Sequence, residues 1–202
     1  MLLLEADLRR PRVADYLGLE GSVGLTNVLA GQVQLQDVLQ TWGRGGLTVL
    51  TSGAIPPNPS ELLGSKAMDE VLQSLLNVFD LVIIDSPPLL PVTDAAVIAA
   101  RADGALLVVR HGKTSRSQVK AAASALTTVD ARLIGAVLNM VPTRGADAYA
   151  YQYGYAYYED SVDRGRLDTD EPVEIAKRSR IDTADGDTRA LEVASRVRTS
   201  AR

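Results

Sequence analysis

Carboxylates at the ends of short apolar segments are the side chains of this sequence best suited to chemistry. Residues 81–88 read LVIIDSPP, so four apolar residues lead directly into Asp85 and Ser86. If the apolar run is a buried strand, it delivers the Asp85 carboxylate to the edge of a sheet, where it can hold Mg²⁺ directly or through water. Pro87 and Pro88 then end the strand. The simpler alternative is a strand that ends in a turn with a capping aspartate.

A second acidic motif lies at the start of the chain, where residues 2–11 read LLLEADLRRP. Glu5 and Asp7 are two residues apart, so both side chains can face the same side of an extended segment. Such a pair offers a second metal ligand and a general base, and Arg9 can contact phosphate oxygens or an acidic partner. The alternative is a strand end followed by a solvated cluster of charges.

Polar residues also follow two further apolar segments. Asn139 comes after residues 135–138 (GAVL), and its amide can both donate to and accept from the edge of a nucleobase. A lone asparagine after a strand is also a common turn residue. Arg110 ends residues 105–110 and can face phosphate, although an ordinary surface or ion-pair role is the simpler interpretation.

Tyrosines gather near the C-terminus, where residues 149–158 read YAYQYGYAYY. Alternating tyrosines among glycine and alanine do not build a core, so the segment is either a low-complexity tail or a set of phosphate acceptors. Each phosphate would add about −1.5 to −2 charges, which would turn an adhesive tail into a repulsive one. The candidate acceptors are Tyr149, Tyr151, Tyr153, Tyr155, Tyr157 and Tyr158.

Short apolar runs without polar alternation predict strands buried on both faces, and they alternate with segments of helical periodicity. This pattern predicts an α/β fold with a doubly wound, mostly parallel sheet, in which ligands bind beyond the carboxyl ends of the strands. Ser60 is expected to cap the longest helix. The predicted strands are residues 2–5, 47–51, 81–85, 105–110 and 134–138, and the predicted helices are residues 22–30, 35–40, 60–78, 93–102 and 114–129.

The character of the chain changes after Pro142, because the residues from 159 onward are dense in charges of mixed sign with weak hydrophobic periodicity. We therefore expect a folded domain over residues 1–144 and a mostly disordered tail over residues 145–202, with a short helix at residues 190–197.

The chain has no cysteine and one histidine, which excludes cysteine-based zinc sites and histidine-rich metal sites. Its net charge of −4 argues against a nucleic-acid partner.

Taken together, these motifs resemble those of the bacterial tyrosine kinases, the BY-kinase family of polysaccharide autokinases. Residues 2–11 resemble the family's Walker A′ motif and residues 81–88 its Walker B motif, and residues 55–65 (IPPNPSELLGS) and the tyrosine cluster also match. The resemblance covers about residues 1–158. It implies a P-loop NTPase sheet of the MinD/ParA type, ATP and Mg²⁺ as cofactors, and phosphate transfer to tail tyrosines of a neighbouring subunit in a ring.

The resemblance also implies roles for individual residues. Asp85 would bind Mg²⁺ with help from Asp7, and Glu5 stands where the family has the aspartate proposed to activate the tyrosine hydroxyl. The residues assigned to nucleotide contacts are Arg9, Ser86, Arg110 and Asn139. The implied partners are a transmembrane polysaccharide co-polymerase or activator and a tyrosine phosphatase, at the inner face of the cell membrane, in the control of capsule or exopolysaccharide export.

One feature of the family has no counterpart in the sequence. The pattern G-x-x-x-x-G-K-[ST] occurs nowhere in the 202 residues, and the family places this phosphate-binding loop before the Walker A′ strand, in which Met1 already lies. We therefore expect a sheet that lacks its first strand, with a central gap, and weak kinase activity or none. Two other interpretations stay open. One is a ParA/MinD-type ATPase, and the other is a non-catalytic binding module that docks onto an intact kinase or onto polysaccharide export machinery, or is a substrate of such a kinase.

Overall fold

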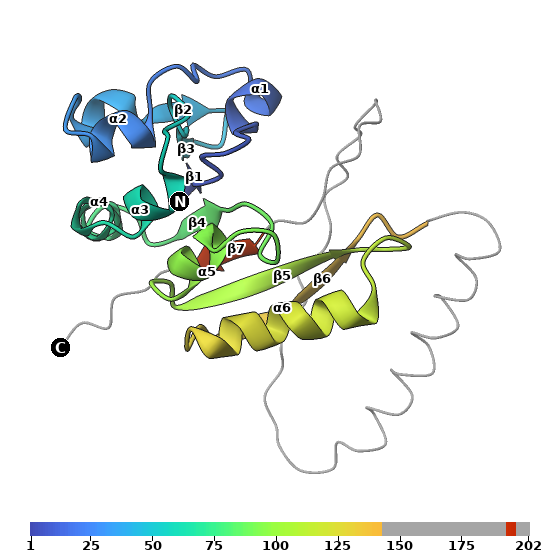
Figure 1. Cartoon of the computed structure of the whole chain (residues 1–202). Helices are drawn as coiled ribbons and strands as arrows, with labels where there is room; N and C mark the ends of the chain where they lie inside the picture. The colour runs from blue at the N-terminus through green and yellow to red at the C-terminus, as the bar shows by residue number, and fades with distance from the viewer. Residues whose placement is uncertain (143–192, 197–202) are drawn as a thin grey trace, which may run out of the picture. The chain divides into compact units, whose positions relative to one another are not determined.

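The structure, a computed structural model, describes residues 1–142 and 193–196, and a sheet of seven strands forms the centre of this part (Figure 1). The strands are β1 (Leu2–Glu5), β2 (Gln40–Trp42), β3 (Leu47–Leu50), β4 (Val82–Asp85), β5 (Gly104–Arg110), β6 (Leu133–Asn139) and β7 (Val193–Arg196). They lie in the order β2-β3-β1-β4-β7-β5-β6. Because β1 pairs in parallel with β3 and β4, and β5 with β6, the mostly parallel sheet predicted from the sequence is confirmed.

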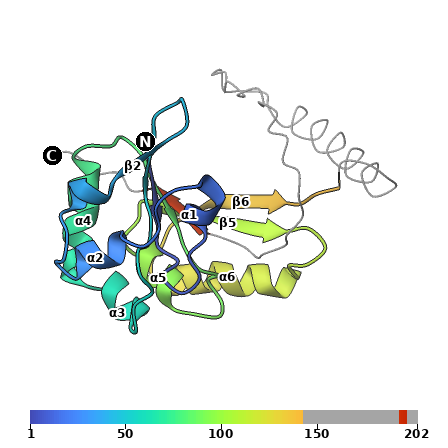
Figure 2. The same cartoon turned by 90° about the horizontal axis from the view of Figure 1, so that it is seen from above.

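Helices connect the strands and pack against the sheet. Leu4 and Ile84 are fully buried in a cluster with residues of α4, and Leu107 packs with residues of α6, which runs alongside β5 in Figure 2. No helix in the described ranges combines the length and the apolar composition needed to cross a lipid bilayer. The helices are α1 (Val13–Leu17), α2 (Leu25–Leu29), the 3₁₀ helix η1 (Leu35–Val38), α3 (Pro59–Leu63), α4 (Lys66–Leu76), α5 (Asp94–Ala99) and α6 (Arg116–Thr128).

The single helix predicted over residues 60–78 is wrong, because the chain interrupts it between α3 and α4. Ser65 lies in the interruption, and its Oγ accepts a hydrogen bond from the Met68 N–H at 3.2 Å, which caps α4. Ser60, expected as the cap, lies within α3 and donates its hydroxyl to Asp94 instead. The helix predicted over residues 35–40 is also too long, since Gln40 already begins β2.

Strand β7 comes from near the C-terminus and occupies the centre of the sheet between β4 and β5 (Figure 1). It runs antiparallel to both neighbours, with Ser195 opposite Ile84 on one side and opposite Ala105 on the other. The helix predicted at residues 190–197 is therefore wrong over residues 193–196, and β7 closes the gap expected in the sheet. Because β7 has neighbours on both sides, it supplies hydrogen-bond partners to two strands at once.

We expect Ala194→Pro to destabilise the full chain, because proline removes a ladder donor from a strand that is paired on both sides. The loss of one such hydrogen bond costs about 1–3 kcal/mol. The measurement is the urea midpoint, together with hydrogen exchange at the amides of Ile84 and Leu106, and Thr199→Pro beyond the end of β7 is the control. An unchanged midpoint for Ala194→Pro would show that β7 does not complete the sheet.

Candidate functional site

The carboxyl ends of β1 and β4 lie next to each other, which places the two acidic motifs at one edge of the sheet. The strands pair in register with Glu5 opposite Asp85, and the Ala6 N–H donates to the Asp85 carbonyl oxygen at 2.7 Å. In-register neighbours on parallel strands point their side chains to the same face. Glu5 and Asp85 therefore lie on one face at this edge, and Asp7 follows two residues beyond the register pair.

Glu5 is fully buried, and its carboxylate accepts three backbone hydrogen bonds. Oε1 accepts from the Arg12 N–H at 2.5 Å and the Val13 N–H at 2.7 Å, both at the start of α1. Oε2 accepts from the Ser52 N–H at 3.0 Å, after β3. The sequence motif predicts a general base at this position, whereas the carboxylate here faces backbone donors of its own domain and ties β1 to two neighbouring segments.

Asp7 is half-buried, whereas its neighbours Ala6 and Leu8 are fully buried. Its Oδ1 accepts hydrogen bonds from the N–H groups of Arg9 at 3.1 Å and Arg10 at 3.0 Å, which closes a tight turn. Its Oδ2 has no hydrogen-bond partner among the residues that the structure describes. Asp7 can therefore present one carboxylate oxygen to a ligand at the sheet edge.

Arg9 forms a two-pronged ion pair with Asp94, the first residue of α5. Its Nε donates to Oδ2 of Asp94 at 2.6 Å, and its Nη2 donates to Oδ1 at 3.0 Å. Asp94 is fully buried and also accepts a hydrogen bond from the hydroxyl of Ser60. Arg9, predicted to contact the nucleotide, thus uses its guanidinium to hold α3 and α5 against the turn after β1, although its side chain stays 41% exposed.

The environment of Asp94 favours its charged form. Burial acts to raise the pKa of Asp94, but the hydrogen bonds from Arg9 and Ser60 and the positive charge of Arg9 lower it. The pKa of Asp94 ends below its ordinary value. Asp94 and Ser60 were not recognised from the sequence as members of the site, because an acidic residue at the start of a helix is common and carries no sign of its partner.

The other predicted nucleotide contacts are spread along the sheet. Arg110 and Asn139 are paired at the carboxyl ends of β5 and β6, but β7 lies between β4 and β5. The backbone of Arg110 is therefore about 10 Å, or two strand spacings, from the β4 strand that ends in Asp85. Ser86 is buried directly after β4. The tyrosine cluster at residues 149–158 lies outside the described residues.

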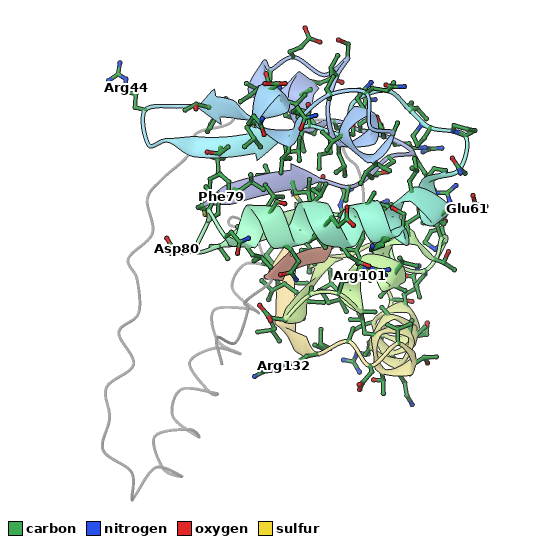
Figure 3. All side chains as sticks on the ribbon, turned by 90° about the vertical axis from the view of Figure 1, so that its left-hand side faces the viewer. Arg44, Glu61, Phe79, Asp80, Arg101 and Arg132 are labelled. Carbon is green, nitrogen blue, oxygen red and sulfur yellow. The ribbon has the colours of Figure 1, made fainter. Side chains whose placement is uncertain are left out.

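We expect Glu5→Gln to destabilise the protein by about 1–3 kcal/mol, because the glutamine amide brings an NH₂ group against backbone N–H donors. Urea denaturation of the full chain at pH 7 measures the change. Glu61→Gln is the matched control, since Glu61 is an exposed glutamate at α3 (Figure 3). If Glu5→Gln were as stable as wild type, the structural role of Glu5 would be contradicted, and the predicted role as a general base would be favoured instead.

The lowered pKa of Asp94 predicts a pH-dependent contribution to stability. A carboxylate whose pKa is lower in the folded state stabilises the fold above the ordinary aspartate pKa of about 3.9 and loses this effect as the pH falls below it. Asp94→Asn should therefore melt at a lower temperature than wild type at pH 7, with a difference that shrinks as the pH falls from about 4 toward 2. A difference that stays constant over this range would contradict a role for the Asp94 charge.

Comparisons with known proteins give close sequence and structural matches, although no protein-family model matches the chain. The chain is 43% identical over 154 residues to the tyrosine-protein kinase YwqD of Bacillus subtilis, which covers 76% of this chain and 65% of YwqD. The solved kinase domain of the Escherichia coli tyrosine kinase ETK matches with a TM-score of 0.69 and 39% identity, over 72% of this chain and 57% of that one. The solved kinase domain of VpsO matches with a TM-score of 0.67 and 35% identity, over 70% of each chain.

Sequence identity and fold agree with the resemblance carried by the two acidic motifs. The chain spans slightly less than two thirds of YwqD, at 65%, and 21% of the longer Escherichia coli tyrosine-protein kinase etk. The match nevertheless covers about three quarters of the present chain at 40–43% identity. Since the chain also covers 70% of the VpsO kinase domain at 35% identity, it belongs to the bacterial tyrosine kinase family.

Proposed function

We propose that this chain supplies the acidic, Mg²⁺-holding side of the ATP site in a bacterial protein-tyrosine kinase that controls capsule or exopolysaccharide synthesis. The observation that supports this most is the in-register pairing of Glu5 with Asp85, which joins the two acidic motifs at the ligand edge of the sheet. Family membership supports it independently and weighs against a ParA/MinD-type ATPase, since the relatives are named tyrosine-protein kinases.

The residues at this edge suit Mg²⁺, which proteins usually hold through one or two carboxylates together with phosphate oxygens and water. Asp85 ends β4, and Asp7 has one carboxylate oxygen without a hydrogen bond to the described residues. The same ranges contain no group of three or more His, Cys, Asp or Glu side chains around a common metal position, so the proposed site relies on these two carboxylates. When bound, Mg²⁺ would neutralise charge on the β- and γ-phosphates of ATP.

The chain has fewer residues suited to binding the phosphates of ATP than to binding Mg²⁺. A Gly-rich loop holds phosphates through its backbone N–H groups and its lysine, and no G-x-x-x-x-G-K-[ST] pattern occurs in the sequence. Arg9 remains a candidate contact through its exposed part, but two of its nitrogens are bound to Asp94. We therefore expect the purified chain to transfer phosphate slowly or not at all.

The lack of a G-x-x-x-x-G-K-[ST] pattern in the sequence also favours a second candidate function, in which this chain is a substrate of an intact kinase of the family.

The remaining parts of the proposal concern the acceptor and the partners. The six tyrosines of residues 149–158 are the proposed phosphate acceptors. The proposed partners are further copies in a ring, a transmembrane activator of polysaccharide export and a tyrosine phosphatase, with the protein peripheral to the inner face of the cell membrane. Family membership is the support for each of these partners, and the net charge of −4 weighs against nucleic acid.

The test is Mg²⁺-dependent binding of ADP to the full chain, measured by calorimetry with Mg²⁺ and with EDTA. Wild type should bind ADP more tightly with Mg²⁺, and Asp85→Asn should weaken the Mg²⁺-dependent binding by at least about tenfold, or about 1.4 kcal/mol. Asp80→Asn is the matched control, because Asp80 stands before β4, at the other end of the same strand (Figure 3). The proposal would be contradicted if the affinity for ADP were the same with Mg²⁺ and with EDTA, or if Asp80→Asn lost as much Mg²⁺-dependent affinity as Asp85→Asn.

Mass spectrometry of residues 149–158 separates the two candidate functions. The purified chain with Mg²⁺ and ATP should acquire little phosphate on these tyrosines, and addition of an intact relative such as YwqD shows whether the chain is a substrate. Efficient phosphorylation by the chain alone, abolished by Asp85→Asn, would overturn the expectation of weak activity.

A further inference from the structure

Arg9 connects two acidic residues through different parts of itself. Its guanidinium binds the buried Asp94 through two hydrogen bonds of 2.6 and 3.0 Å, while its backbone N–H donates to Oδ1 of Asp7 at 3.1 Å. A planar guanidinium held through two nitrogens has a defined direction, which a single contact would not give it. The side-chain contact with Asp94 is therefore coupled to the turn that carries Asp7.

The turn after β1 has two anchors. Leu8 is fully buried in the main core cluster and holds the middle of the turn. The pair between Arg9 and Asp94 holds its far end. The hydroxyl of Ser60 donates a further hydrogen bond to the Asp94 carboxylate and so helps to fix its position. Helix α5 follows β4 in the chain. Asp94, at the start of α5, therefore links the turn that carries Asp7 to the segment that follows Asp85.

We propose that Asp94 is a positioning residue for Asp7: through Arg9, it fixes the turn that directs the Asp7 carboxylate toward the divalent cation. This inference rests on the proposed function, because it takes Asp7 as a ligand of Mg²⁺. Asp94 does not itself contact the ion, since its side chain is fully buried and bound to Arg9 and Ser60. Asp7, in contrast, is half-buried and has one oxygen available.

Removal of the Asp94 charge should weaken metal binding more than it disturbs the fold. Asparagine has nearly the same size as aspartate but offers Arg9 one neutral oxygen in place of two charged ones. The turn would then keep the Leu8 anchor and the 3.2 Å hydrogen bond from Nη2 of Arg9 to the Ser60 hydroxyl. Without the fork to Asp94, the Asp7 carboxylate would sample more orientations. Residues that orient a metal ligand from outside typically change metal affinity by about 10- to 100-fold when they are replaced.

The experiment is a titration of the ¹⁵N-labelled full chain with MgCl₂ at constant ionic strength, followed through the amide signals of Asp7, Arg9 and Arg10. We expect Asp94→Asn to raise the dissociation constant for Mg²⁺ by about tenfold or more. Asp69→Asn is the matched control, because it removes the same charge and an ion pair of 2.7 Å with Arg101, which lies beside α4 (Figure 3). Its dissociation constant should equal that of wild type.

Asp7→Asn distinguishes the failure of this inference from the failure of the proposed function. If wild type and Asp7→Asn respond equally to Mg²⁺, Asp7 is not a ligand and the proposed function fails with this inference. If the response requires Asp7 but Asp94→Asn binds Mg²⁺ like wild type, only the positioning role is overturned. The amide signals of Leu4 and Ile84, in the core, report whether each variant keeps the fold.

Arg9→Lys carries the test if Asp94→Asn does not fold. Lysine keeps the positive charge but cannot bind both oxygens of Asp94 through a planar fork. The positioning role requires weaker Mg²⁺ binding in this variant with unchanged core signals, and wild-type affinity would overturn it.

Discussion

The register between β1 and β4 is the constraint on which the candidate site depends. Side chains alternate between the two faces of a strand, so a slip of one residue would turn Glu5 away from Asp85. The core prevents such a slip, because Leu4 and Ile84 are fully buried and belong to the same hydrophobic cluster. The packing of leucine and isoleucine on one face thus decides where the carboxylates lie on the other.

Two buried carboxylates stabilise the segments around this edge by different means. A buried charge is costly unless it is paired or hydrogen-bonded. Glu5 is compensated by three backbone N–H groups, and Asp94 by the guanidinium of Arg9 and the hydroxyl of Ser60. Between these two compensated groups, Asp7 keeps an available oxygen. The acidic motif at the start of the chain is therefore divided between residues that hold the backbone and one that can meet a ligand.

Strand β7 affects the site through the spacing of the sheet. It pairs with β4 and β5 along both of its edges, so neither strand has an open edge at this position. It also separates the acidic ends of β1 and β4 from the polar ends of β5 and β6 by one further strand. A ligand bound at Asp85 would have to extend across this strand to reach Arg110 or Asn139.

The amino-acid sequence by itself determined the parallel strands and the edge at which Glu5 and Asp85 meet, because an apolar run that ends in a carboxylate is a local signal. Only the tertiary structure decided which distant residues the side chains and strands of this region contact. Arg9 meets Asp94 across 85 residues, and Ser60 joins them because α3 and α5 pack against the turn after β1. Residues 193–196 (VASR) have no strong strand pattern of their own, and they form β7 because two neighbouring strands offer backbone partners. Contacts of this kind depend on how distant segments pack, which no local pattern of residues encodes.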